Sequence, residues 1–295
     1  MTLTQQIDKL FEEQVQSWPR LARGVDGLKH AQTRPVRMDW FDVFIRHIPH
    51  RVVSTTAAVD RESIAKRPCF LCAGNLDPEE RGIPFNPDYT IYCNPLPIVD
   101  RHLTIVHRDH GIQHIAGEAG AMLDLAAALP GYFVIYNGPE CGASAPDHMH
   151  FQAGSRDLFP IERDTAEVQG ISVPNYARSV LLFRDAFRSH LIDRIDSAVE
   201  LLSNVTRKRP EPLINIAVFY EGGRWTAYVF PREKHRPQVF HTGELTVSPA
   251  SIDLCGIFVV PLGKDFARIA GADIASIFRE VSLSDEILKE VAARL

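Results

Sequence analysis

The sequence predicts an α+β fold in which helices flank an antiparallel sheet and the chain consists of two related halves. Short β-prone runs bounded by Gly, Pro and Asn lie between a few helical stretches. The first half has the order strand, helix, strand, loop, strand, and in the second half a helix precedes a hairpin. We therefore divide the chain into residues 1–160 and residues 161–295.

The first half begins with an amphipathic helix, because Ile7, Leu10 and Phe11 recur at helical spacing. An Ala- and Leu-rich helix further along ends at Pro130-Gly131, which cannot continue it. The apolar run after that stop is typical of a buried strand. The predicted elements are a helix over residues 4–18, strands over 36–44 (with Trp40), 90–92 and 102–106, a helix over 117–129 and a strand over 131–136.

The second half repeats this theme. A turn-forming segment, Glu221-Gly222-Gly223-Arg224, separates two apolar runs and predicts a hairpin. Ser284 is the expected N-cap of the last helix. The predicted elements are a helix over residues 191–202, hairpin strands over 213–220 and 225–230, a strand over 254–261, and helices over 274–278 and 284–295.

Composition excludes several classes of protein. The chain has 295 residues, 45% of them hydrophobic, which is enough for a substantial core. A formal net charge of −5 argues against general affinity for nucleic acid or anionic membranes, so a site for phosphorylated ligands would need a locally positive pocket. Residues 1–11 do not resemble a signal peptide, and no apolar run approaches the roughly 18 residues that span a bilayer. We expect a cytoplasmic protein without nucleic-acid or membrane partners.

Five cysteines make an odd count with one close pair, Cys69 and Cys72. This pattern favours reduced thiols over a disulfide framework. Two thiolates separated by two residues can bind one zinc ion from the ends of a tight turn. A C-x-x-C pair alone is also compatible with a redox dithiol or a metal-free pair, so a zinc site needs two further ligands elsewhere, expected to be histidines.

The most informative stretch runs from Asn137 to Gln152. Its first part is a loop of small residues, whose backbone N–H groups can close around an anion. From His148 the pattern has period two, which places His148, His150 and Gln152 on one face of a strand and two apolar residues in the core. A lone His-x-His more often lines the polar face of a sheet. The adjoining loop and glutamine favour phosphoryl chemistry at an imidazole instead.

The segment His148-Met149-His150-Phe151-Gln152-Ala153, after an N-G…G-x-S loop, resembles the histidine-triad superfamily, in its nucleotidyltransferase and phosphorylase branch. That branch contains galactose-1-phosphate uridylyltransferases, diadenosine tetraphosphate phosphorylases and GDP-hexose phosphorylases. The residues of the motif are most similar to those of the GDP-hexose phosphorylases. The resemblance covers most of the chain and implies a histidine-triad-like sheet whose second half has lost its histidines.

A second likeness lies in Cys69-Phe70-Leu71-Cys72-Ala73-Gly74-Asn75, which is nearly identical to the segment that opens the zinc site of the uridylyltransferases. Carried over, the ligands of a structural zinc are Cys69, Cys72, His148 and a histidine after the strand that follows the cysteine pair. His110 is the best match for the last, with His107 and His114 as competitors. GDP-hexose phosphorylases do not depend on this zinc, so the chain combines features of two subfamilies.

The resemblance also implies substrate-binding residues. The loop supplies Asn137, Gly142 and Ser144, and an arginine near position 51 contacts substrate phosphates in these families, which makes Arg51 a candidate. A surface arginine is the commoner explanation for Arg51 alone. Lys234 lies in a basic segment after the second hairpin strand, where a solvated loop and a phosphate contact are equally compatible with the sequence.

The resemblance implies nucleotidyl transfer by double displacement, with His150 as nucleophile and Gln152 and the loop stabilising charge on the phosphoryl oxygens. The substrate would be a nucleoside diphosphate-sugar or a dinucleoside polyphosphate, and phosphate or a sugar phosphate would accept the nucleotidyl group. The alternatives are a hexose-1-phosphate uridylyltransferase and a non-catalytic, zinc-stabilised nucleotide-binding protein. Members of these families often pair, so a homodimer is one option, although no sequence feature marks an interface.

Overall fold

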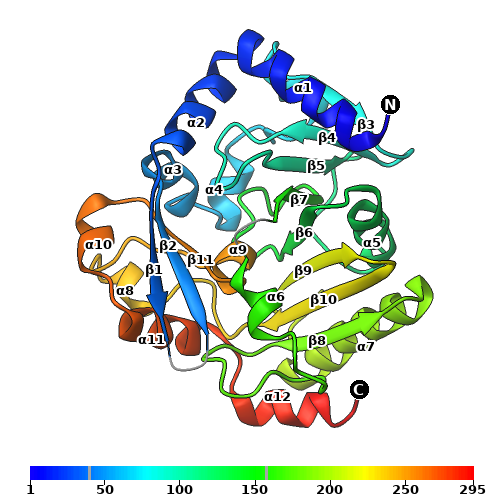
Figure 1. The fold of residues 1–295 in the computed structure, drawn as a ribbon, viewed down its shortest axis with the longest axis vertical. Helices are drawn as coiled ribbons and strands as arrows, with labels where there is room; N and C mark the ends of the chain where they lie inside the picture. Colours follow the sequence, from blue (N-terminus) through cyan, green and yellow to red (C-terminus); the bar gives the residue numbers. More distant parts are fainter. Residues whose placement is uncertain (39–40, 157–158) are drawn as a thin grey trace.

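The computed structural model describes residues 1–38, 41–156 and 159–295. Its main feature is an eight-stranded sheet with the order β3-β4-β5-β7-β6-β9-β10-β8 (Figure 1), in which every pairing is antiparallel. The strands are β3 Gly82–Pro84, β4 Tyr89–Cys93, β5 Leu103–His107, β6 Tyr132–Asn137, β7 His150–Ser155, β8 Leu181–Asp185, β9 Ile214–Glu221 and β10 Arg224–Pro231. The predicted fold class is confirmed.

The two halves of the chain share this sheet. Strand β6 from the first half pairs with β9 from the second, and their last partners in register are Asn137 and Asn215. Gly222 and Gly223 in the β9–β10 turn both have positive φ, a conformation that glycine adopts without strain. Whether each half folds alone, as the division at residue 160 implies, stays a prediction.

One face of the sheet is covered by helices. Strand residues such as Phe151 and Val134 pack there against α5 and α7, and Figure 1 shows these helices side by side on one side of the sheet. Apolar burial of this kind contributes about 25 cal/mol per Å². The helices that supply this core are α1 Leu3–Ser17, α2 Pro19–Lys29, α5 Ala119–Ala128, α7 Arg188–Thr206 and α12 Asp285–Ala292.

The opposite face packs against a small second sheet with the order β1-β2-β11. Its strands are β1 Gln32–Arg37, β2 Asp42–His47 and β11 Ile257–Val260, and α6 Pro160–Asp164, α9 Ser251–Leu254 and α11 Gly271–Val281 complete this layer. The other short helices are η1 Pro49–Arg51, α3 Val52–Thr55, α4 Arg61–Ala65, η2 Ala73–Asn75, α8 Gln238–His241 and α10 Gly263–Arg268. His150 and Gln152 project from β7 toward this second layer, because Phe151 between them enters the helical core.

Most predicted elements are confirmed, including the terminal helix, where Ser284 accepts a hydrogen bond from the Ile287 N–H. The single strand predicted over residues 36–44 is wrong. Its two ends belong to different strands, β1 and β2, which pair antiparallel, and the Met38 N–H donates to the Phe41 carbonyl. Trp40, which that prediction included, lies outside the described residues.

The strand predicted over residues 254–261 is shorter than expected, because Leu254 ends α9 and Cys255 and Gly256 form a turn. The remaining strand, β11, pairs in parallel with β2 of the first half. Within the described ranges, no helix is both long and apolar enough to cross a membrane.

Candidate active site

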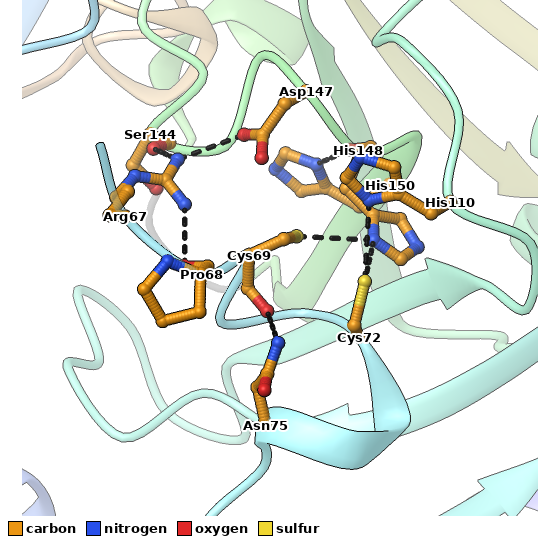
Figure 2. Close-up of polar contacts among 10 residues, drawn as sticks. All are labelled: Arg67, Pro68, Cys69, Cys72, Asn75, His110, Ser144, Asp147, His148 and His150. Carbon is orange, nitrogen blue, oxygen red and sulfur yellow. Dashed lines mark hydrogen bonds and ion pairs between the residues drawn. The ribbon is translucent and has the colours of Figure 1, made fainter. Parts of the chain in front are cut away.

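The C-x-x-C turn and two histidines form a compact cluster. One donor atom from each of Cys69, Cys72, His110 and His148 lies within 4.8 Å of the others. The Sγ atoms of Cys69 and Cys72 are 3.3 and 3.6 Å from His148 Nδ1, and Cys72 Sγ is 3.3 Å from His110 Nδ1. Figure 2 shows the four side chains converging on one point.

These distances fit a tetrahedral metal ion. Ordinary Zn–S and Zn–N bonds would separate sulfur and nitrogen ligands by about 3.5 Å. His148 donates its Nε2–H to the His107 carbonyl at 2.7 Å, which leaves the Nδ1 lone pair directed at the cysteines. The side chains of His107 and His114 bond elsewhere, to the Asp109 backbone and the Pro210 carbonyl. Of the three candidates, only His110 joins the cluster.

The cysteine turn is fixed to the small-residue loop. Arg67 forms an ion pair with Asp147 at 2.8 Å and donates to the Ser144 carbonyl (Figure 2). Asn75 donates to the Cys69 carbonyl at 2.9 Å and closes the turn from its far side. The metal cluster therefore holds two loops together beside the strand that carries His150.

A cavity of about 520 Å³ opens next to this cluster. Its floor is the open face of β4, β5, β7 and β6, and its walls come from the cysteine turn, residues 51–59, the small-residue loop and the second half of the chain. Of the predicted site residues outside the metal cluster, those that line it are Arg51, Asn137, Gly142, Ser144, His150 and Gln152.

His150 is only 3% exposed, and its Nδ1–H donates to the His148 carbonyl at 2.8 Å. This bond selects the tautomer whose Nε2 carries the free lone pair. Burial lowers the His150 pKa to about 4, so the ring is neutral near pH 7. Nε2 has no hydrogen-bond partner in the described part of the chain and is available to a ligand in the cavity.

Gln152 is held by a histidine that we did not single out from the sequence. The Ile98 N–H donates to His102 Nδ1 at 3.2 Å, and a backbone N–H can only donate. Burial lowers the His102 pKa to about 3, so the ring is neutral and carries its proton on Nε2. That proton is donated to Gln152 Oε1 at 2.9 Å. The Gln152 amide group is left free to donate into the cavity.

Asn137 and the loop present further donors. Asn137 Oδ1 accepts from Asn215 Nδ2 and from the Ser251 N–H, at 2.8 and 3.0 Å, and leaves Nδ2 free. Gly142 has φ +99°, and a Cβ there would lie 2.6 Å from the Ala250 side chain, so only glycine fits. Among the described residues, the N–H groups of Gly142 and Ser144 make no hydrogen bond, as an anion site requires.

The two predicted cationic contacts differ in outcome. Arg51 lines the cavity, where it donates to the Leu96 carbonyl at 2.9 Å, and burial lowers its pKa to about 10. Lys234 does not line the cavity, because its ammonium pairs with Glu280 at the surface, at 3.1 Å. The neighbouring Arg236 lines it instead and donates to the carbonyls of residues 55 and 57, at 2.9 Å each.

Two carboxyl groups, those of Asp77 and Glu80, also line the cavity, together with Arg20 and Thr104. Asp77 accepts from the Trp18 indole at 3.0 Å and pairs with Arg20 at 3.3 Å. Burial, with a smaller contribution from Asp77, raises the Glu80 pKa to about 7. These carboxyl groups can accept hydrogen bonds from hydroxyl or N–H donors of a ligand.

Sequence comparison divides the chain between two family models. Residues 10–155 match a domain of unknown function (DUF4922), and residues 155–295 match a family described as GDPGP1-like, C-terminal domain. No curated protein matches the sequence.

Solved structures share the fold. The chain is similar to yeast Ap4A phosphorylase Apa2 in complex with AMP, with a TM-score of 0.65 and 16% identity over 95% of this chain and 96% of that one. For the same enzyme in complex with Ap4A the TM-score is 0.62, with 14% identity over 93% and 95% of the two chains. A weaker likeness, with a TM-score of 0.36 and 14% identity, covers 86% of this chain and all (100%) of an ADP-glucose phosphorylase from Arabidopsis thaliana with bound ADP-glucose. The chain therefore shares the fold of Ap4A phosphorylase, and its second half matches the GDPGP1-like C-terminal domain family.

Proposed function

We propose that this chain transfers a nucleotidyl group through a covalent intermediate on His150. The substrate is a nucleoside diphosphate-sugar or a dinucleoside polyphosphate, cleaved at its α-phosphorus, and inorganic phosphate is the acceptor. The observation that carries this proposal is the state of the His150 ring, which is neutral, fixed through Nδ1 and open to the cavity at Nε2.

In the first step the Nε2 lone pair attacks the α-phosphorus, and the bond to the bridging oxygen breaks. That oxygen leaves with the electron pair, as hexose 1-phosphate or as a nucleoside polyphosphate. In the second step an oxygen of phosphate attacks the same phosphorus, the P–N bond breaks, and the ring recovers its lone pair. Charge on the phosphoryl oxygens is stabilised by the free amide groups of Gln152 and Asn137 and by the loop N–H groups.

The lining of the cavity suits a ligand that carries both phosphates and hydroxyl groups. Arg20, Arg51, Arg67 and Arg236 line it and attract phosphates. Asp77 and Glu80 also line it and can accept hydrogen bonds from the hydroxyl groups of a ribose or a hexose. A nucleotide-sugar offers both kinds of group.

A bound zinc ion would have a structural role. Cys69, Cys72, His110 and His148 would fill all four positions of a tetrahedral ion, which leaves no position for water. The same cluster favours a second candidate, a hexose-1-phosphate uridylyltransferase, in which a sugar phosphate replaces inorganic phosphate as acceptor. A binding protein without turnover is disfavoured by the open Nε2 of His150.

Mass measurement of the intact protein tests the proposal. Wild type is incubated with UDP-, ADP- and GDP-hexoses and with Ap4A, without phosphate, and an added nucleoside monophosphoryl group is expected from one of them. Phosphate, or hexose 1-phosphate for the second candidate, should then remove the group. The His150→Ala variant should bind the nucleotide and gain no mass. An adduct on that variant would refute the nucleophile, and wild type without adduct or turnover would refute the activity.

A further inference from the structure

A buried arginine of the second half reaches the cavity through two asparagines. Arg232 is 2% exposed, and its Nη1 donates to Asn215 Oδ1. Asn215 is fully buried, and its Nδ2 donates to Asn137 Oδ1 at 2.8 Å. Asn137 lines the cavity. The sequence signal is a lone polar residue in the otherwise apolar run Ile214-Asn215-Ile216-Ala217.

The identities of the bonded atoms allow only one direction along this chain. Asn215 Nδ2 also lies 2.7 Å from the Cys141 carbonyl, which can only accept, so this atom must be the nitrogen. Arg232 can only donate, which agrees with the oxygen of Asn215 as its partner. The Ser251 N–H can only donate to Asn137, so the atom of Asn137 that it contacts must be the oxygen. Asn137 Nδ2 must then face the cavity as a donor.

Arg232 forms no direct ion pair with a carboxylate in the described residues. Its other N–H groups donate to the carbonyls of Lys234, His235, Pro249 and Val281, all of them neutral. Burial lowers the Arg232 pKa, and the nearby Cys141 and Asp253 offset this only in part. An anion in the neighbouring cavity would therefore stabilise the guanidinium further.

We infer that Arg232 is a positioning residue for the substrate phosphate, acting through Asn215 and Asn137. This inference rests on the proposed function and adds the contribution of the second half to it. The guanidinium polarises the two amides in the same direction, so the Asn137 N–H group becomes a stronger donor to a phosphoryl oxygen.

Ligand charge separates this role from a structural one. Binding of AMP, GMP and UMP and of adenosine, guanosine and uridine is measured by ligand-observed NMR on wild type, Asn215→Ala, Arg232→Met and Arg232→Lys. We expect Asn215→Ala and Arg232→Met to weaken the best-bound mononucleotide about tenfold or more and its nucleoside less than twofold. Arg232→Lys, which keeps the charge, should recover part of the loss.

Arg184→Met is the matched control, because Arg184 also donates only to carbonyls but lies on β8, away from the cavity. It should leave both affinities unchanged. Asn215→Ala should add no further loss to Asn137→Ala. Equal weakening of nucleotide and nucleoside, or full additivity of the two asparagine variants, would overturn the inference. If Arg232→Met does not fold, Asn215→Ala alone decides. Wild type that binds no mononucleotide would instead contradict the proposed function.

Discussion

The His148 carbonyl lies 2.8 Å from the Nδ1 atom of His150. Two residues that are two positions apart thus belong to the Cys/His cluster and to the proposed catalytic site. The side chain of His148 faces Cys69 and Cys72 while its backbone fixes the tautomer of His150. Any movement of this residue therefore changes the direction of the Nε2 lone pair. In the proposed function, His148 would therefore link metal binding to the orientation of His150.

Loss of the metal should accordingly impair both folding and transfer. We expect purified protein to contain one zinc per chain and Cys72→Ser to lose it. The melting temperature should fall by roughly 6–10 °C, which corresponds to about 3 kcal/mol for a chain of this size. The rate of adduct formation should fall because His148 is released. Elemental analysis, thermal melts and adduct mass measure these effects.

Cys93→Ala is the control for this experiment. Cys93 is fully buried in the helical core and is not part of the cluster. Its substitution should lower the melting temperature and leave the zinc content unchanged. A Cys72→Ser protein that retains stoichiometric zinc would show that the cluster is not the metal site.

A second prediction concerns His102, a fully buried residue that orients Gln152 through a hydrogen bond. His102→Leu removes the donor to Gln152 Oε1, so the amide is free to turn its oxygen toward the phosphate. We expect kcat to fall about tenfold to a hundredfold with a smaller change in KM. In a Gln152→Ala background the same substitution should cost almost nothing, because its effect is transmitted through Gln152.

His47→Leu provides the comparison, since His47 also bonds to the backbone, at the Val260 carbonyl, but lies outside the cavity. Steady-state kinetics on the four proteins of the cycle and this control are sufficient. Independent, additive losses at His102 and Gln152 would mean that the histidine supports the fold and does not orient the amide.

The sequence predicts those parts of the site that depend on the spacing of residues close together in the chain. The alternation around His150 places Phe151 in the core and the histidine in the cavity, as its period requires. The cysteine turn likewise defines half of a metal site within four residues. His110 needed the family resemblance, because three histidines lie close together in the sequence.

The parts that could not be predicted depend on tertiary contacts. His102 meets Gln152 across 50 residues and Asn215 meets Asn137 across 78, and neither pairing leaves a periodic pattern. The alternation of polar and apolar residues over 36–44 predicts one strand, and nothing in that pattern marks the change of direction between β1 and β2. Lys234 and Arg236 are both basic residues of one short segment, so the sequence does not distinguish them. In the structure the Lys234 side chain pairs with Glu280 at the surface.

A third prediction follows from Asp253, which accepts from the N–H groups of Ala250 and Val259 and so shapes the segment that carries Ser251. Burial raises the Asp253 pKa from 3.8 to about 6. The folded state therefore holds this proton more tightly than the unfolded state. The associated stability is fully present below about pH 4 and is lost as the pH rises through 6, by about 3 kcal/mol in total.

Urea unfolding of wild type and Asp253→Asn between pH 4.5 and 7 tests this sign. At pH 4.5 the variant should have a lower free energy of unfolding than wild type, because an amide group replaces one of the two acceptor oxygens. Its free energy of unfolding should not fall as the pH rises from 4.5 to 7. Parallel curves for the two proteins would assign the pH dependence to other groups.

The last prediction compares two basic residues of the same loop. Arg236 donates to the carbonyls of Thr55 and Ala57, so it fastens residues 51–59 of the first half over the cavity. Arg236→Met should release that wall and lower kcat/KM at least tenfold. Lys234→Met removes only an exposed ion pair with Glu280, which contributes at most about 1 kcal/mol, and should change kcat/KM less than twofold. Kinetics with the substrate that forms the adduct decide between them. A larger loss of kcat/KM for Lys234→Met than for Arg236→Met would show that Lys234 contacts the substrate phosphate. The ion pair with Glu280 would then have to open when the substrate binds.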